Sequence, residues 1–379
     1  MPEVIVNSWI YAALIISLFL FCIHGADFLD LFLRKLTDLL PQNRNGAEDG
    51  PGKHLFNTGE GVPKMVPIST GVLSLDLALG TGGLPRGCLT EIYGRKFSGK
   101  TTLMLHAIAE TQKMGGVAAF IDTGGHVFDP LYAQKIGVNV SDLIISTPNS
   151  AEQAFKEIKR LVISSRVDLV IINSLADLVF KAELENKILN PTHVSGQVHM
   201  ISHELRQLKS LVSATTSSVV FFNQLQRNIG ILFSQPERTP GGLALKFYSS
   251  VRIDMQKVKT IKQGDVPTGA HIHARVVKNK FAAPNRNADL EILNDQGIST
   301  EGYLIDMGVK IGLLKKIGPW LVYKTERIGQ SRESAKEYFK KHKDKAAKME
   351  TELRGKLFLS GPGRAELTPV REPEIYETK

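Results

Sequence analysis

One short stretch of the sequence has the residue types and spacing of a phosphate-binding loop. Residues 94–101 (GRKFSGKT) match the pattern G-x-x-x-x-G-K-[ST], and they lie between a predicted strand at 89–94 and a predicted helix at 101–114. Glycines let backbone amides point into one concavity, and the helix N-terminus adds a partial positive charge. The lysine of such a loop reaches the β- and γ-phosphates, and the threonine hydroxyl binds Mg²⁺. The sequence therefore predicts a nucleotide site formed by Gly94, Arg95, Lys96, Phe97, Ser98, Gly99, Lys100, Thr101 and Thr102.

The elements that position this loop alternate between short apolar runs and amphipathic stretches. Helices are predicted at 101–114 and 151–164, and the clearest strands are at 89–94, 117–122, 168–173, 217–223, 249–255 and 271–280. This alternation predicts an α/β fold whose mostly parallel central sheet has helices on both faces. The last two strands follow one another closely, which predicts an antiparallel edge.

Composition excludes several classes of protein. The chain has 379 residues, of which 42% are hydrophobic, 22% charged and 7% aromatic, so it is not a disordered, collagen-like or multi-span membrane protein. Its two cysteines, Cys22 and Cys88, are too few for a disulfide framework or a zinc cluster. A net charge of +9 and a pI near 9.3 favour a polyanionic partner.

The sequence divides into five predicted segments. Most of the excess positive charge lies in one of them, 301–360, a small α+β unit with 14 Lys/Arg and 8 Asp/Glu and a helix from about Ser334, where Ser334 and Glu337 fit a capping box. The segments are an apolar stretch at 1–26, an amphipathic helix and linker at 27–64, the α/β core at 65–300, the basic C-terminal unit at 301–360, and a loose tail at 361–379.

The N-terminal stretch is open to more than one interpretation. Residues 9–23 are apolar apart from Ser17 and could span a bilayer, although they are at the short end of the length required. No Lys or Arg precedes them, so they make a poor secretory signal. The alternatives are a helix buried against a partner subunit, or an extension from an upstream start codon.

Several strings outside the phosphate loop carry a family resemblance. They are residues 68–87 (ISTGVLSLDLALGTGGLPRG), 222–224 (FNQ), 244–252 (ALKFYSSVR), 276–280 (VVKNK), 308–310 (GVK), Trp320 and 328–330 (IGQ). With these strings the chain closely resembles the bacterial RecA recombinases over residues 66–357. Residues 1–60 match poorly, and the tail lacks the acidic run common in the family.

The resemblance implies an ATP- and Mg²⁺-dependent protein of the cytoplasm that forms helical filaments on single-stranded DNA and acts in repair and damage signalling. ATP would lie between neighbouring protomers. Asp129 and Tyr132 resemble the adenine contacts, and Gln224 resembles the switch that senses the γ-phosphate. Lys278 and Lys280 resemble the pair that reaches the γ-phosphate of the next subunit, where they would stabilise charge. Lys100, Gln224, Lys278 and Lys280 are thus the expected catalytic group.

The DNA-binding residues are also implied by the resemblance. Residues 225–242 resemble the second DNA loop, in which arginines and backbone amides contact phosphates and an apolar side chain enters between bases. Residues 183–196 occupy the place of the first DNA loop and depart from its usual pattern. The C-terminal unit would capture duplex DNA through Lys315, Lys316, Lys324, Arg327, Lys340 and Lys341. The expected single-strand contacts are Arg206, Arg227, Asn228, Phe233, Arg238, Gly241 and Gly242.

Two departures from the family pattern concern ATP hydrolysis. After Asp122 the family has a glutamate that polarises the attacking water, whereas this chain has Thr-Gly-Gly-His at 123–126. The family's aspartate at the end of the strand 168–173 is Asn173 here, which can bind a Mg²⁺-bound water but brings no charge. Loss of a water-positioning group costs a factor of about 10² to 10⁴ in rate. We therefore expect ATP to bind and to be hydrolysed slowly or not at all, unless Asp122 or His126 takes the role.

Two other functions fit parts of the sequence. One is a hydrolysis-deficient paralogue, membrane-anchored through residues 9–23 with its core in the cytoplasm, that binds DNA and regulates an active relative. The other is a P-loop kinase or transport ATPase, against which the glycines of the DNA loop and the basic C-terminal unit argue.

Overall fold

The computed structural model of the chain describes residues 66–125, 128–184, 191–227, 237–238 and 242–358. All described residues belong to one compact unit, Pro63–Lys379. The predicted apolar stretch, amphipathic helix, linker and tail lie outside the described residues. Of the helices that the structure describes, none is long and apolar enough to cross a membrane.

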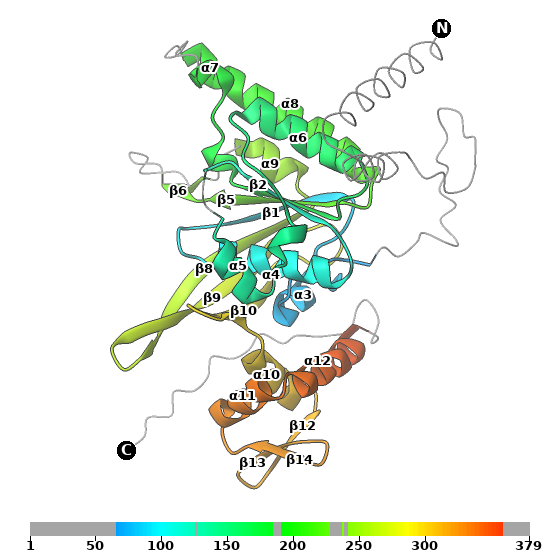
Figure 1. Ribbon diagram of the computed structural model, residues 1–379, viewed down its shortest axis with the longest axis vertical. Coiled ribbons are helices and arrows are strands. Elements are labelled where there is room, and N and C mark those ends of the chain that lie inside the picture. The colour runs from blue at the N-terminus through cyan, green and yellow to red at the C-terminus, as the bar shows by residue number, and fades with distance from the viewer. Residues whose placement is uncertain (1–65, 126–127, 185–190, 228–236, 239–241, 359–379) are drawn as a thin grey trace, which may run out of the picture. The chain divides into compact units, whose positions relative to one another are not determined.

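A nine-stranded sheet forms the centre of the fold (Figure 1), in the order β11-β10-β9-β8-β1-β5-β4-β2-β3. In this order the neighbouring strands on the side of β8 that ends at β3 are parallel, whereas the pairs β8–β9, β9–β10 and β10–β11 are antiparallel. The predicted mostly parallel sheet with an antiparallel edge is therefore confirmed. The strands are β1 (Cys88–Gly94), β2 (Ala118–Asp122), β3 (Ile144–Ser146), β4 (Leu169–Asn173), β5 (Ser218–Gln224), β8 (Val251–Gln263), β9 (Val266–Asn279), β10 (Arg286–Leu293) and β11 (Gly297–Ser299).

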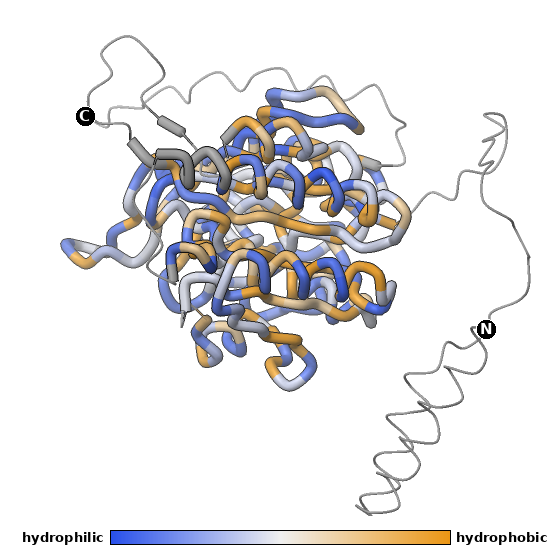
Figure 2. Tube along the Cα trace, turned by 90° about the horizontal axis from the view of Figure 1, so that it is seen from above, coloured by the Kyte–Doolittle hydropathy of each residue, from blue (hydrophilic) through white to orange (hydrophobic). Residues whose placement is uncertain are grey.

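Helices cover both faces of the sheet because successive strand side chains point in opposite directions. Phe222 packs into the cluster beneath α3, α4 and α5, whereas its neighbour Phe221 packs into the cluster beneath α6, α8 and α9. Hydrophobic and hydrophilic stretches accordingly alternate along the chain (Figure 2). The helices are α3 (Leu73–Leu79), α4 (Lys100–Lys113), α5 (Pro130–Ile136), α6 (Ala151–Ile163), α7 (Lys181–Leu184), α8 (Pro191–Ser213) and α9 (Gly242–Tyr248), with 3₁₀ turns at Val140–Asp142 and Leu175–Asp177.

The C-terminal part has its own small core. A three-stranded antiparallel sheet packs with three helices around a cluster that includes Leu304, Phe339 and Leu353. The expected α+β unit is therefore confirmed. Its elements are α10 (Glu301–Lys310), β12 (Leu314–Ile317), β13 (Trp320–Tyr323), β14 (Glu326–Gly329), α11 (Arg332–Lys341) and α12 (Lys343–Phe358).

The capping box expected at Ser334 is wrong by one turn. Helix α11 begins at Arg332, and its cap is Ser331, whose hydroxyl accepts from the backbone N–H of Ser334 at 3.1 Å. The Ser334 hydroxyl in turn accepts from the Ser331 N–H at 2.9 Å. A serine can complete this exchange in place of the usual Glu or Gln, and for that reason the sequence pattern pointed to the wrong residue.

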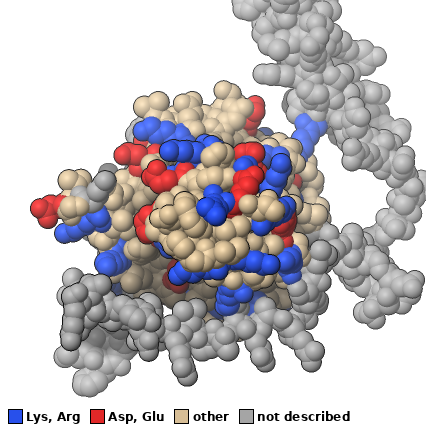
Figure 3. All heavy atoms as spheres, turned by 90° about the horizontal axis from the view of Figure 1, so that it is seen from below, with Lys and Arg blue, Asp and Glu red and all other residues tan. Residues whose placement is uncertain are grey.

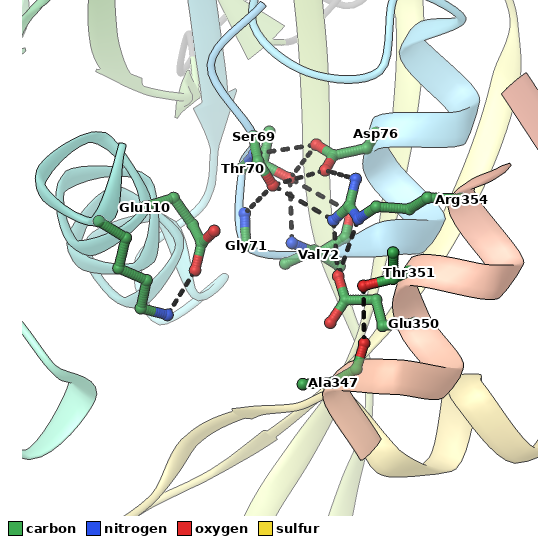
Figure 4. A network of polar contacts seen from close by, with 11 residues as sticks. Ser69, Thr70, Gly71, Val72, Asp76, Glu110, Ala347, Glu350, Thr351 and Arg354 are labelled. Carbon is green, nitrogen blue, oxygen red and sulfur yellow. Dashed lines mark hydrogen bonds and ion pairs between the residues drawn. The ribbon is translucent and has the colours of Figure 1, made fainter. Parts of the chain in front are cut away.

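A buried ion pair joins α3 of the core to α12 of the C-terminal part (Figure 4). The Asp76 side chain is fully buried and accepts from Ser69 Oγ (2.7 Å), Thr70 N (2.9 Å) and Thr70 Oγ1 (2.7 Å). Arg354 Nη1 lies 2.9 Å from Asp76 Oδ2, and Arg354 Nη2 lies 2.8 Å from Glu350 Oε1. Because a buried carboxylate is costly unless it is paired, these contacts define how the two parts of the unit pack.

A second ionic contact joins the same two parts at β10. Glu291 lies 3.3 Å from Arg332 and also pairs with Lys336, both on α11. These cations lower the pKa of Glu291 against the opposing effect of burial. The C-terminal part is thus held to the core at α3 and at β10.

Candidate nucleotide and DNA-binding site

The phosphate loop lies where β1 ends and α4 begins, as the sequence predicted. Gly99 has a φ of 81°, and a Cβ there would lie 2.3 Å from Ile292 Cδ1. A Cβ at Gly94 would lie 2.2 Å from the carbonyl oxygen of Met255. The fixed backbone carbonyl of Met255 requires glycine at position 94, and the left-handed backbone favours glycine at position 99.

Lys100 extends over the loop that precedes it. Its Nζ donates to the carbonyl oxygens of Gly94 (3.0 Å) and Arg95 (2.7 Å) and to Ser98 Oγ (3.2 Å). Burial lowers the pKa of Lys100 to about 8. The arrangement places an ammonium group beside a glycine-lined helix N-terminus, which fits the phosphates of a nucleotide.

The other loop residues divide into a buried and an exposed group. Ser98 is buried, whereas Arg95, Lys96, Phe97 and Thr101 are exposed, Phe97 by 88%. The exposed Thr101 hydroxyl at the first turn of α4 and the half-buried Asn173 at the end of β4 carry oxygen atoms. Such ligands fit a Mg²⁺ ion that keeps several of its waters.

The predicted base-binding residues lie at the start of α5, next to α4: Tyr132 is in the helix and Asp129 directly precedes it. Asp129 caps α5 through Oδ1, which accepts from the backbone N–H groups of Leu131 (2.9 Å) and Tyr132 (3.1 Å). Tyr132 Oη lies 3.0 Å from Thr102 Oγ1. One hydrogen bond thus links the proposed stacking ring to the helix that carries the phosphate loop.

Three of the predicted residues end neighbouring strands at one edge of the sheet. Gly94 of β1 is paired in register with Gln224 of β5, and Asn173 of β4 is paired with Asp122 of β2. Because the carboxyl ends of parallel strands meet at one edge, the phosphate loop, Asn173 and Gln224 lie there together. The peptide bond between Asn173 and Ser174 is cis.

The segment without the expected glutamate is tied to the end of β4. Thr123 N donates to the Asn173 carbonyl (3.0 Å), and Thr123 Oγ1 donates to the Ser174 carbonyl (2.6 Å). Asp122 is buried, and its Oδ1 accepts from Gly124 N (3.2 Å). Both side chains therefore support the turn, and His126 lies outside the described residues.

Sequence reasoning missed a buried polar cluster beneath Gln224. Glu91 is fully buried and accepts from Arg252 Nε (2.5 Å) and Asn223 Nδ2 (3.2 Å). The Arg252 guanidinium also lies 4.6 Å from the centroid of the Tyr93 ring. The signal that could have found this cluster was Glu91, the one charged residue of the otherwise largely apolar strand β1.

Lys278 and Lys280 lie beside the first half of β1, whereas the phosphate loop follows the end of that strand. The backbone N–H of Lys280 donates to the Ser250 carbonyl (3.1 Å), and Ser250 N donates to the carbonyl of Leu89, at the start of β1. Lys278 pairs in register with Arg252, and β9 ends one residue before Lys280. The structure does not bring these lysines to the phosphate loop of their own chain.

The predicted DNA contacts are only partly within the described residues. Arg206 is exposed on α8. In the segment 225–242, which was expected to be a DNA loop, β6 (Gln226–Arg227) and β7 (Glu237–Arg238) form a short antiparallel pair, and Gly242 opens α9. Outside the described residues lie Asn228, Phe233 and Gly241.

Basic residues of the C-terminal part lie on its surface. Lys315 and Lys316 are exposed on β12, and the Arg327 guanidinium lies 5.4 Å from the Trp320 ring centroid. Lys324 pairs with Glu352 at 2.5 Å. Figure 3 shows Lys and Arg over the face seen from below, interspersed with Asp and Glu.

Comparisons with known proteins match both parts of the described unit. Residues 53–299 match the family model of the RecA N-terminal domain, and residues 302–358 match that of the RecA C-terminal domain. Protein RecA of Clostridium perfringens is 44% identical over 323 residues, which cover 85% of this chain and 91% of the relative. Protein RecA of Heliobacterium modesticaldum is 45% identical over 320 residues, covering 84% and 92%. A crystal structure of the RadB recombinase has a TM-score of 0.47 and 26% identity, covering 61% of this chain and 98% of that one. The chain belongs to the RecA family and is, by homology, a RecA-family recombinase.

Proposed function

We propose that the protein binds ATP and Mg²⁺ at the phosphate loop, forms helical filaments on single-stranded DNA, and pairs that strand with homologous duplex in repair and damage signalling. It would act in the cytoplasm. Asp129 and Tyr132 would hold the base, and Lys100 and Gln224 would contact the phosphates. Lys278 and Lys280 would reach the nucleotide of the neighbouring protomer, and the C-terminal lysines would capture duplex DNA.

The observation that carries this proposal is a shared carbonyl. The oxygen of Gly94 accepts from Lys100 Nζ (3.0 Å) and also from the backbone N–H of Leu225 (3.1 Å). Leu225 is the first residue of the proposed DNA loop. Phosphate binding that draws Lys100 away would therefore alter the contact that holds this loop, which supports coupling of ATP binding to DNA binding.

We infer that hydrolysis is impaired. Asn173 replaces the expected aspartate, and Thr123 and Asp122, beside the place of the missing glutamate, are engaged with backbone groups. The chemistry that ATP and Mg²⁺ supply when bound is a phosphoryl group poised for attack by water. The chain's own residues would then bind and orient the nucleotide without activating that water.

Binding and turnover assays test the proposal together. A fluorescent single-stranded oligonucleotide should bind the wild type more tightly with ATP and Mg²⁺ than without, and Lys100→Ala should abolish the difference.

Asn173→Asp should raise ATP turnover about 10- to 100-fold by restoring a charge near the metal. The matched control Asn173→Ala removes the amide without adding a charge and should not raise turnover. Rapid ATP turnover by the wild type would contradict the proposed impairment, and equal hydrolysis by the wild type and Asn173→Asp would contradict the role given to Asn173.

A second candidate function is favoured by the same Asn173. A hydrolysis-deficient paralogue could regulate the filaments of an active relative, tethered to the membrane through residues 9–23. Membrane fractionation of the full chain tests the tether. Filaments formed by the purified protein alone, without an active relative, would favour the recombinase over the regulator.

A further inference from the structure

An exposed carboxylate lies beside the segment that lacks the expected glutamate. Asp177 ends the 3₁₀ turn Leu175–Asp177, which follows β4 after a single intervening residue, Ser174. The backbone N–H of Asp177 donates to the Ser174 carbonyl (3.1 Å), and the Thr123 hydroxyl donates to the same carbonyl (2.6 Å). One carbonyl oxygen therefore joins the turn that carries Asp177 to the segment after β2, where a water-activating group was expected.

The turn lies at the edge of the sheet that carries the phosphate loop. It packs against β5, whose last residue, Gln224, is paired in register with Gly94 of the phosphate loop. The carboxyl ends of parallel strands form the ligand-binding edge of an open α/β sheet. Asp177 is thus on the side of the sheet where the phosphates of a nucleotide would lie.

The carboxylate of Asp177 is oriented by one neighbour and still has an oxygen that water can reach. Asp177 is exposed, and the hydroxyl of the buried Ser174 donates to its Oδ2 at 2.5 Å. Among the described residues no other group donates to this side chain, which leaves Oδ1 open to a water molecule. Asp122 differs, because it is buried and accepts from Gly124 N within its own turn. Of the two carboxylates, Asp177 has the accessible oxygen that a general base requires.

We propose that Asp177 is the general base for a slow hydrolysis of ATP by this protein. The proposal rests on the proposed function and departs from it in one respect, since Asp177 supplies the water activation that residues 122–124 do not. The water oxygen bonds to the γ-phosphorus while the bond from that phosphorus to the bridging oxygen breaks, and ADP leaves with the electron pair. Asp177 takes a proton from the water and returns it to solvent. A base acts best within hydrogen-bond reach of the water, and Asp177 is one hydrogen-bonded turn away from the segment where a glutamate was expected, so the rate is low.

Two substitutions separate the charge of Asp177 from its hydrogen bond. Asp177→Asn removes the charge and keeps an oxygen that accepts from Ser174, whereas Asp177→Ala removes both. ATP turnover by the full chain with Mg²⁺ and a single-stranded oligonucleotide should fall about 10- to 100-fold in both variants, while ATP affinity in calorimetry should change by less than about twofold. A purely structural role would lower turnover in Asp177→Ala and spare Asp177→Asn, and that result would overturn the proposal.

Asp142 provides the matched control. It is exposed, it ends the 3₁₀ turn Val140–Asp142, and its Oδ2 accepts from Asn139 Nδ2 at 2.6 Å. That turn precedes β3, which is parallel to β2, so Asp142 lies at the opposite edge of the sheet. Asp142→Asn removes the same charge and should leave ATP turnover unchanged. An equal fall in turnover for Asp142→Asn and Asp177→Asn would show that net charge is responsible, and the proposal would be wrong.

The two assays distinguish the role of Asp177 from the nucleotide binding on which it depends. A wild type that binds ATP but hydrolyses it no faster than Asp177→Asn would overturn the role of Asp177 and leave the inferred impairment in place. A wild type that does not bind ATP in calorimetry would count against the proposed function, and the role of Asp177 would be overturned with it. A wild type that binds ATP, hydrolyses it slowly and loses this turnover in Asp177→Asn would support both.

Discussion

Replacement of Arg354 by methionine tests the ion pair that joins α12 to α3. Asp76 is fully buried, and the substitution removes a guanidinium nitrogen 2.9 Å from its Oδ2 while keeping most of the aliphatic volume. Removing one partner of a buried pair costs about 3–5 kcal/mol, since the remaining charge is left uncompensated. The bonds that Asp76 accepts from Ser69 and Thr70 remain and offset part of this cost. We therefore expect a loss of about 3 kcal/mol in the free energy of unfolding at neutral pH.

The loss should depend on pH, with a sign that the burial of Asp76 determines. Burial raises the pKa of Asp76 above its usual 3.8, and the charge of Arg354 opposes this increase. An acid whose pKa is higher in the folded state binds more protons when folded, so stability falls as pH rises from the unfolded pKa through the folded one. Removal of Arg354 raises the folded pKa further. The destabilisation should consequently be small at a mildly acidic pH and large at a mildly alkaline pH.

Urea unfolding at these two pH values measures the effect. The double variant Asp76→Asn/Arg354→Met carries neither charge, so its stability relative to wild type should vary much less with pH. Lys324→Met breaks an exposed pair with Glu352 and should change stability little at either pH. An equal loss for Arg354→Met at both pH values would refute the reasoning, and so would a loss no larger than that of Lys324→Met.

Three further predictions concern the nucleotide site. Gly99→Ala should lower the thermal unfolding temperature more than Gly115→Ala. Both positions have a left-handed backbone (φ of 81° and 75°), but only Gly99 has described atoms within 4 Å of a new Cβ. Equal shifts in the unfolding temperature would contradict the steric argument. Tyr132→Phe should weaken ATP binding about two- to fivefold in calorimetry, because the ring remains but its bond to Thr102 is lost; unchanged affinity would mean that this bond does not orient the ring. ATP affinity should fall as pH rises above about 8, because Lys100 loses its charge there. The nucleotide-free protein should become more stable between that pH and the usual lysine pKa of 10.5, because the unfolded chain binds more protons than the folded one in this range. An ATP affinity that is flat across this range would show that Lys100 keeps its proton.

Local features of the sequence were sufficient to predict the phosphate loop and the sheet. Gly94 to Thr101 form a contiguous motif whose strand and helix are also contiguous, so pattern and spacing located it. The strands at 168–173 and 217–223 are apolar on both faces, which is the pattern of a parallel strand buried between two helical layers. The capping box at Ser331 was missed because serine takes the part of the usual acidic residue.

The contacts that connect the site to the rest of the protein depend on residues far apart in the chain. Arg252 and Glu91 are separated by 161 positions, and Arg354 and Asp76 by 278. No periodicity relates such residues, because their proximity arises from the order of strands in the sheet and from the packing of one part of the unit on another. The side-chain direction of Lys278 is of the same kind. Its spacing from Lys280 predicted a shared face, but only the tertiary structure brought the carbonyls of α9 within reach of its ammonium group.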